Sequence, residues 1–195
     1  MSKADPVVSK KARNKTIRWV VTIFLITIVI SGMISMLSDE IMSKSGIVMA
    51  FLILLIIILV GIVFDIIGMA VATADEKPFH SMASRKVPGA SDAIKLLRNA
   101  ERVSSICNDV VGDICGVVSG SASATIAAQI LANFEFTWPE IVTLLMSALA
   151  AGLTVGGKAI GKSFAVNSST KIVHGVGRMV HILHPAAKPS RNKKK

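Results

Sequence analysis

Four long apolar runs, each without a charged residue, constrain this sequence more than any other feature. They cover residues 19–38, 45–64, 114–134 and 141–157, and each contains between seventeen and twenty-one residues. A bilayer core about 30 Å thick is crossed by roughly 17–25 apolar residues in an α-helix. The runs therefore predict an all-α integral membrane protein with four transmembrane helices. They exclude a soluble enzyme, a secreted disulfide scaffold and a disordered chain.

The composition agrees with this class of protein. Hydrophobic residues make up 52% of the chain and charged residues only 17%, whereas about 25% of a soluble domain is charged. The formal net charge is nevertheless +10, because the basic residues are concentrated outside the apolar runs. Each Lys or Arg close to anionic headgroups contributes about 1 kcal/mol to membrane attraction. The basic C-terminal cluster has no interleaved aromatic residues to stack on bases, so we expect a lipid bilayer and no nucleic acid as its partner.

The basic residues are unevenly divided among the connecting segments. Segments 1–18, 65–102 and 158–195 contain six, six and nine Lys or Arg, whereas 39–44 contains one and 135–140 none. Cytoplasmic segments of membrane proteins carry the excess of positive charge. We therefore expect a multi-pass protein of the cell (plasma) membrane with both termini and the 65–102 segment in the cytoplasm. The first apolar run is longer than a signal-peptide core of about 7–15 residues, so we expect it to remain as an anchor.

Two segments outside the runs have the apolar spacing of amphipathic helices. Apolar residues recur at helical intervals between Ile172 and Leu183, and Ser91 is predicted to cap a short helix before the third run. We expect both to be juxtamembrane helices. Within the third run, Gly116 and Gly120 have the G-x-x-x-G spacing that lets membrane helices approach closely. This pair is predicted to serve helix packing.

Ionisable and amide side chains lie at the ends of the apolar runs. Asp109 and Asp113 are four residues apart and so share one helix face at the start of the third run, and Asp65 follows the second run. Ionisable groups inside a bilayer are costly and normally face a bundle interior or a water-filled path. One interpretation is a cation route lined by Asp65, Asn108, Asp109 and Asp113. The other is that all of them lie at the cytoplasmic headgroup level, where their charge costs little.

Residues 156–163 match the phosphate-binding pattern G-x-x-x-x-G-K-S. That loop binds phosphate when it joins a strand to a helix, whereas here it follows a small-residue membrane helix. A nucleotide site is therefore not expected. The histidines and cysteines show no ligand or nucleophile spacing, and we expect no catalytic residues and no enzyme activity.

Two segments of the sequence match, in order and spacing, two motifs of one protein family. They are residues 95–102 (Lys-Leu-Leu-Arg-Asn-Ala-Glu-Arg) and residues 157–165 (Gly-Lys-Ala-Ile-Gly-Lys-Ser-Phe-Ala). The stretch from Phe64 to Leu183 resembles the transmembrane domain of the CNNM/CorC (CorB) family of magnesium/cobalt exporters. The resemblance covers more than half of the chain. It does not include the family's cytoplasmic nucleotide-sensing (CBS) pair.

The resemblance implies a domain organisation and a metal site. Residues 45–184 would be the family-like transmembrane domain, preceded by an extra transmembrane helix (19–38) and a basic cytoplasmic N-terminus (1–18), and followed by a basic cytoplasmic tail (185–195). A family Asn would correspond to Asn108. The family's metal-binding Glu is replaced by Lys158, an ammonium where an Mg²⁺ ligand is expected, so the inherited site is partly dismantled.

Two hypotheses remain open from the sequence. The first is a reduced divalent-cation transporter, expected to be a homodimer that binds Mg²⁺ through its carboxylates. The second is a non-transporting accessory or scaffold membrane protein of the same fold, with its basic faces on lipid or a partner. A separate cytoplasmic regulatory chain is a further candidate partner, in place of the family's CBS pair.

Overall fold

The chain is helical throughout the residues described by the structure, a computed structural model that covers residues 6–183, with side chains from residue 17 onwards. It contains no strand in this range. Four stretches are long and apolar enough to cross a membrane: 17–44, 47–73, 100–133 and 139–167. The predicted all-α fold with four spanning helices is therefore confirmed. The predicted basic tail, 185–195, lies outside the described residues.

The spanning helices extend beyond the apolar runs that predicted them. Helix α1 covers Pro6–Lys44, α2 covers Ile47–Thr73 and α7 covers Pro139–Asn167. Part of the basic N-terminus thus continues the first helix instead of forming a separate segment. Helix α7 starts with a proline, a residue whose missing N–H costs nothing at the first helical position. Charge-free runs indicate which residues lie in the bilayer core, whereas the ends of the helices depend on the local backbone chemistry.

The third spanning stretch consists of three consecutive segments of two helix types, α and π. Helix α5 (Ala100–Ser105) leads into a π-helical stretch, η1 (Ile106–Gly112), which leads into α6 (Asp113–Asn133). The π-helix has wider turns than an α-helix and is often found at functional sites. The predicted third helix began at Ile114, since the polar residues of η1 interrupt the apolar run.

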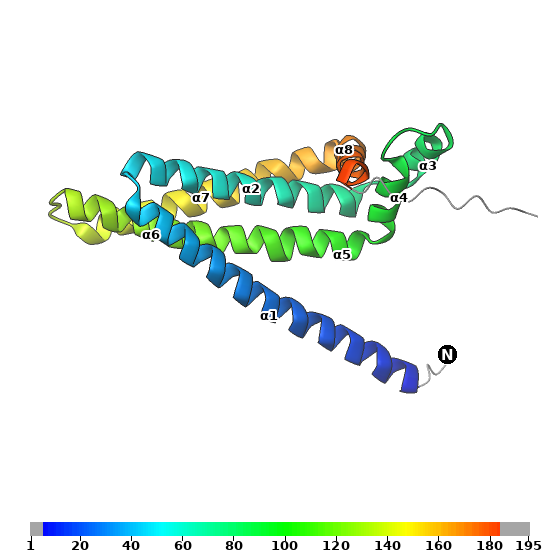
Figure 1. Cartoon of the computed structure of the whole chain (residues 1–195), viewed down its shortest axis with the longest axis horizontal. Coiled ribbons are helices and arrows are strands. Elements are labelled where there is room, and N and C mark those ends of the chain that lie inside the picture. Colours follow the sequence, from blue (N-terminus) through cyan, green and yellow to red (C-terminus); the bar gives the residue numbers. More distant parts are fainter. Residues whose placement is uncertain (1–5, 184–195) are drawn as a thin grey trace, which may run out of the picture. The chain divides into compact units, whose positions relative to one another are not determined.

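The chain divides into two compact units. The first consists of residues up to 58 together with 113–151, and the second of 59–112 together with the residues from 152 on. In the first unit α1 crosses α6 near the C-terminal end of α1 (Figure 1). There the Asp39 carboxylate accepts hydrogen bonds from the hydroxyls of Ser121, at 3.0 and 3.2 Å, and of Thr125, at 3.0 Å. One α6 turn further on, Gln129 donates to the Met42 carbonyl at 2.6 Å.

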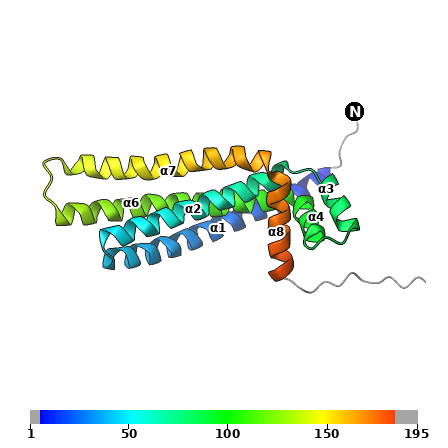
Figure 2. The ribbon, with the colours of Figure 1, turned by 90° about the horizontal axis from the view of Figure 1, so that it is seen from above.

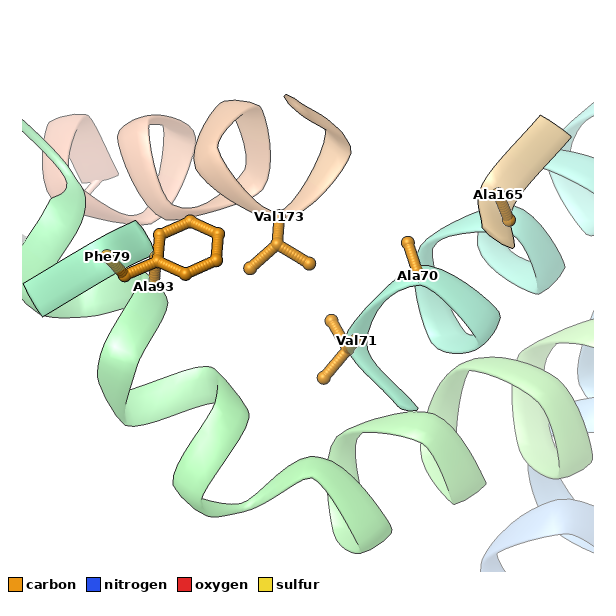
Figure 3. Close-up of a cluster of buried hydrophobic side chains, with 6 residues drawn as sticks. All are labelled: Ala70, Val71, Phe79, Ala93, Ala165 and Val173. Carbon is orange, nitrogen blue, oxygen red and sulfur yellow. The ribbon is translucent and has the colours of Figure 1, made fainter. Parts of the chain in front are cut away.

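The second unit has its own apolar core. The unit consists of the C-terminal part of α2, helices α3 (Lys77–Ser84) and α4 (Ala90–Arg98), α5, η1, the C-terminal part of α7, and α8 (Ser169–Leu183). Phe79 of α3 is fully buried and points toward Val173 of α8 (Figure 3). The other members of this core come from α2, α4 and α7: Ala70, Val71, Ala93 and Ala165.

Helix α8 turns away from α7 and runs crosswise to it (Figure 2), packing on α4. The predicted amphipathic helices are both present, but Ser91 does not cap α4. Gly89 occupies the cap position with a φ of 83°. A Cβ at Gly89 would lie 2.6 Å from the backbone of Arg178, so both the left-handed conformation and the contact with α8 require glycine.

Candidate functional site

Asp65 is the buried ionisable residue around which the site is built. It lies in α2, eight residues before the helix ends at Thr73, which corresponds to about 12 Å of helix. The residue is only 3% exposed. An isolated carboxylate at such a position is costly unless it is paired. The second unit provides that pairing.

Two lysines of α7 face this carboxylate. The Lys158 ammonium lies 3.6 Å from Asp65 Oδ1, and the Lys162 ammonium lies 3.8 Å from Oδ2. The two lysines are four residues apart, so they occupy one face of α7. Lys158 Nζ also donates a hydrogen bond of 3.1 Å to the Gly112 carbonyl at the end of η1. The carboxylate is thus held between two helices by cations.

Glycines bring the helices close enough for these contacts. A Cβ at Gly112 would lie 3.1 Å from Asp65 Oδ1 and 3.3 Å from Lys158 Nζ. A Cβ at Gly68, one turn after Asp65, would overlap the Asn108 side-chain oxygen. Both positions therefore need to remain without a side chain. Gly112 and Gly68 shape the α2–η1 crossing around the polar residues.

Glycines also allow α7 to approach α2 closely. A Cβ at Gly157 or Gly161 would overlap or press on the side chains of Ile62 and Ile66. Small residues allow this kind of close approach between membrane helices. This G-x-x-x-G pair fixes the position of Lys158, which follows Gly157 directly.

The predicted packing pair, Gly116 and Gly120, behaves differently. A Cβ at either residue would meet nothing within 4 Å, because α6 turns a neighbouring face, with Ser121 and Thr125, toward α1. The glycines with close contacts within the described chain are instead Gly68, Gly89, Gly112, Gly157, Gly161 and Gly177. A contact of Gly116 and Gly120 with a second copy of the chain stays a prediction.

The other predicted metal ligands have different surroundings. Asn108 lies in η1, where its amide donates to Ser104 Oγ at 3.3 Å and its Oδ1 is buried without a hydrogen-bond partner. Asp109 is exposed and accepts a 2.7 Å hydrogen bond from Ser105 Oγ. Asp113 begins α6 and belongs to the other unit. Among the described residues, no group of three or more His, Cys, Asp or Glu is placed to hold a metal ion.

Lys158, which stands where the sequence resemblance predicted a metal ligand, is a partner of the carboxylate. The sequence pattern indicated that a cation stands there but not that it pairs with Asp65. Lys162 and Gly112 were not singled out as site residues. Lys162 was detectable from its spacing of four residues from Lys158, whereas nothing in the sequence marks the Gly112 carbonyl.

The phosphate-loop pattern is not a phosphate loop. Residues 156–163 all lie inside α7, so their backbone amides are bonded within the helix and cannot surround a phosphate. This agrees with the expectation from the sequence. The glycines and lysines of the pattern instead serve helix packing and the pairing with Asp65.

The site offers buried acceptor oxygens to a cation or a hydrogen-bond donor. Asp65 Oδ2 and Asn108 Oδ1 are both buried oxygens without a hydrogen-bond partner among the described residues. Both are acceptors, so each would be stabilised by a donor or a cation. An arriving cation would have to compete with two ammonium groups that already face the carboxylate.

Comparisons with known proteins return no match: no family model fits the chain, and no curated protein or solved structure is similar to it.

Proposed function

We propose that this chain is a membrane protein that transports a divalent cation, with Mg²⁺ as its candidate substrate, and that Asp65 is the carboxylate that receives the ion. One observation carries the proposal: a carboxylate that is 3% exposed within a spanning helix is paired with two lysines. Ionisable residues inside a membrane normally belong to ion or proton pathways. A lysine ammonium paired with such a carboxylate occupies the position that a transported cation would take.

The two unpartnered oxygens support the proposal. Asp65 Oδ2 and Asn108 Oδ1 are buried acceptors on two helices that cross at Gly68 and Gly112. Mg²⁺ prefers carboxylate and carbonyl oxygens and usually keeps several of its waters. One carboxylate and one amide oxygen could therefore supply the protein's share of the ligands once an ammonium is displaced from Asp65. The π-helical backbone at Asn108 adds a feature that is frequent at functional sites.

The proposed topology and assembly follow from charge and helix surfaces. Both termini would lie in the cytoplasm of the cell, as the distribution of Lys and Arg favours. The exposed small-residue face at Gly116 and Gly120 would serve a homodimer. A separate cytoplasmic chain would supply regulation.

A second function has a specific observation in its favour. Lys158 also donates to the Gly112 carbonyl, so it holds α7 against η1 as well as neutralising Asp65. In a non-transporting scaffold protein of the same fold, this pairing would be permanent. The two functions differ in whether an external cation can replace an ammonium at Asp65.

Mg²⁺-dependent thermal stabilisation of the purified protein tests the proposal. Wild type should gain stability with rising Mg²⁺, because a ligand that binds only the folded state stabilises it. Asp65→Asn should remove the gain, and Lys158→Glu should increase it by adding an oxygen ligand. Glu101→Gln, at an exposed position of α5, is the matched control and should respond as wild type. A gain that persists in Asp65→Asn would refute the assignment of Asp65.

A further inference from the structure

The two lysines at Asp65 are held in different ways. The Lys158 side chain is 19% exposed, lies 3.6 Å from Oδ1 and donates to the Gly112 carbonyl at 3.1 Å. The Lys162 side chain is 50% exposed and lies 3.8 Å from Oδ2. Lys158 is therefore enclosed and bonded to the backbone of a second helix, whereas Lys162 reaches the carboxylate from a half-exposed position.

Neither ammonium is within hydrogen-bonding distance of the carboxylate, at 3.6 Å for Lys158 and 3.8 Å for Lys162, so the hydrogen bond to the Gly112 carbonyl is what distinguishes Lys158. Oδ2, the oxygen nearest Lys162, is buried and has no hydrogen-bond partner among the described residues. The ammonium of Lys162 is beyond the hydrogen-bonding range of 2.7–3.2 Å, so it covers Oδ2 without bonding to it. Removing Lys162 from this position would break a long ion pair but no hydrogen bond to the carboxylate.

The position of Lys162 along α7 indicates the side of the membrane on which it lies relative to Asp65. Lys162 lies one helical turn, about 5.4 Å, closer than Lys158 to the C-terminal end of α7 at Asn167. That end faces the cytoplasm in the orientation that the basic segments favour. The half-exposed lysine thus lies between the carboxylate and the cytoplasmic end of the helix.

We propose that Lys162 is a movable gate over Asp65 Oδ2, and that Lys158 is the fixed counter-ion of the same carboxylate. A flexible lysine side chain can swing into the aqueous phase and keep its charge hydrated. Asp65 then becomes accessible from the cytoplasmic side while Lys158 keeps it partly neutralised. The part of this inference that concerns Mg²⁺ as the displacing ion rests on the proposed function, whereas the difference between the lysines does not.

Lysine acetylation of the full-length protein in lipid nanodiscs tests the gate. The probe is a water-soluble acetylating ester, and mass spectrometry follows each lysine separately. Lys162 should be acetylated several-fold faster than Lys158, and Asp65→Asn should accelerate Lys162 further by removing its partner. Lys171, an exposed lysine of α8, is the internal control and should not change. Equal rates at Lys158 and Lys162, or an unchanged Lys162 rate in Asp65→Asn, would overturn the inference.

Addition of Mg²⁺ separates the gate from the proposed substrate. If Mg²⁺ takes over the carboxylate, it should accelerate acetylation of Lys162 in wild type and have no effect in Asp65→Asn. Acceleration by Asp65→Asn without any Mg²⁺ effect would support the gate and contradict Mg²⁺ as the displacing ion. Acceleration of Lys158 instead of Lys162 by Mg²⁺ would overturn the assignment of fixed and movable lysines.

A second variant tests the same point from the carboxylate. Lys162→Gln should increase modification of Asp65 by a water-soluble carbodiimide and amine, because the cover over Oδ2 is removed. Lys171→Gln is the matched control. Unchanged modification of Asp65 in folded Lys162→Gln would contradict the gate.

Discussion

Lys158 Nζ lies 3.6 Å from Asp65 Oδ1, so the lysine that replaces the expected metal ligand is the direct partner of the buried carboxylate. The pair joins α7 to α2 within one compact unit. It neutralises a buried charge whose other ion pair, with the half-exposed Lys162, is longer. Stability and cation binding should therefore both depend on this contact.

Lys158→Met should destabilise the protein by about 3 kcal/mol, because removing the enclosed partner of a buried pair leaves Asp65 only the longer contact with the half-exposed Lys162. The double variant Asp65→Asn/Lys158→Met should recover much of this loss. Unfolding of the purified protein in mixed micelles measures both. Lys44→Met is the control. It breaks the ion pair between Lys44, whose side chain is 73% exposed, and Glu40, whose side chain is 59% exposed, and should cost less than about 1 kcal/mol. Equal losses in the two single variants would refute a buried pair.

Gly68→Ala should destabilise the protein by about 1–3 kcal/mol, the usual cost of forcing extra atoms into a packed contact. The new methyl group would overlap the Asn108 side chain and push η1 away from α2. Gly32→Ala in α1, where a Cβ meets nothing within 4 Å, should be neutral or slightly stabilising. The same unfolding assay compares the two. A neutral Gly68→Ala would contradict the close crossing.

The α4–α8 contact should weaken in acid. A hydrogen bond from Lys95, followed in weight by the contact with His181, lowers the pKa of Asp92 despite its partial burial. A lowered pKa in the folded state means that the contribution of Asp92 is present above its unfolded pKa of about 3.9 and is lost as the pH falls below that value. The protection of the α8 amides against hydrogen exchange, corrected for the intrinsic pH dependence of exchange, should therefore decrease below about pH 4 in wild type, and Asp92→Asn should show a smaller pH response. Identical pH profiles would refute the linkage.

Asp39 and Thr125 should be energetically coupled. Their 3.0 Å hydrogen bond connects α1 to α6, and hydrogen bonds between membrane helices contribute about 0.6–1.7 kcal/mol. A double-mutant cycle with Asp39→Ala and Thr125→Ala should give a coupling energy of about 1 kcal/mol. Thr22 bonds only to the Arg18 carbonyl of its own helix among the contacts described, so Thr22→Ala paired with Asp39→Ala should show no coupling. A Thr125 cycle that also gives zero would mean that the contact does not hold α1.

The sequence was sufficient for the spanning helices, because bilayer thickness translates directly into the length of an apolar run. It was not sufficient for their ends. Helix α2 continues nine residues past the run that ends at Phe64, to Thr73, since the residues that follow, Asp65 included, are compatible with a helix. The charge of Asp65 ended the apolar run without ending the helix.

The site was only partly predictable for a similar reason. Asp65 and Lys158 were each recognisable as ionisable residues at the ends of apolar runs. Their pairing depends on how α7 crosses α2, which is set by Gly157 and Gly161 against Ile62 and Ile66. Sequence spacing within one helix carries no information about that crossing. For Asp109, the position four residues before Asp113 was clear from the sequence, but the exposure of its side chain was not.

Mg²⁺ flux into proteoliposomes that contain an Mg²⁺-sensitive dye tests the central claim most directly. Wild-type protein should carry Mg²⁺ faster than empty vesicles, and Asp65→Asn should reduce the rate to the level of empty vesicles because it removes the receiving carboxylate. Glu101→Gln should transport as wild type. Wild-type flux no greater than that of empty vesicles, with the protein folded and inserted, would contradict the account and leave Asp65 and its lysines as a structural contact.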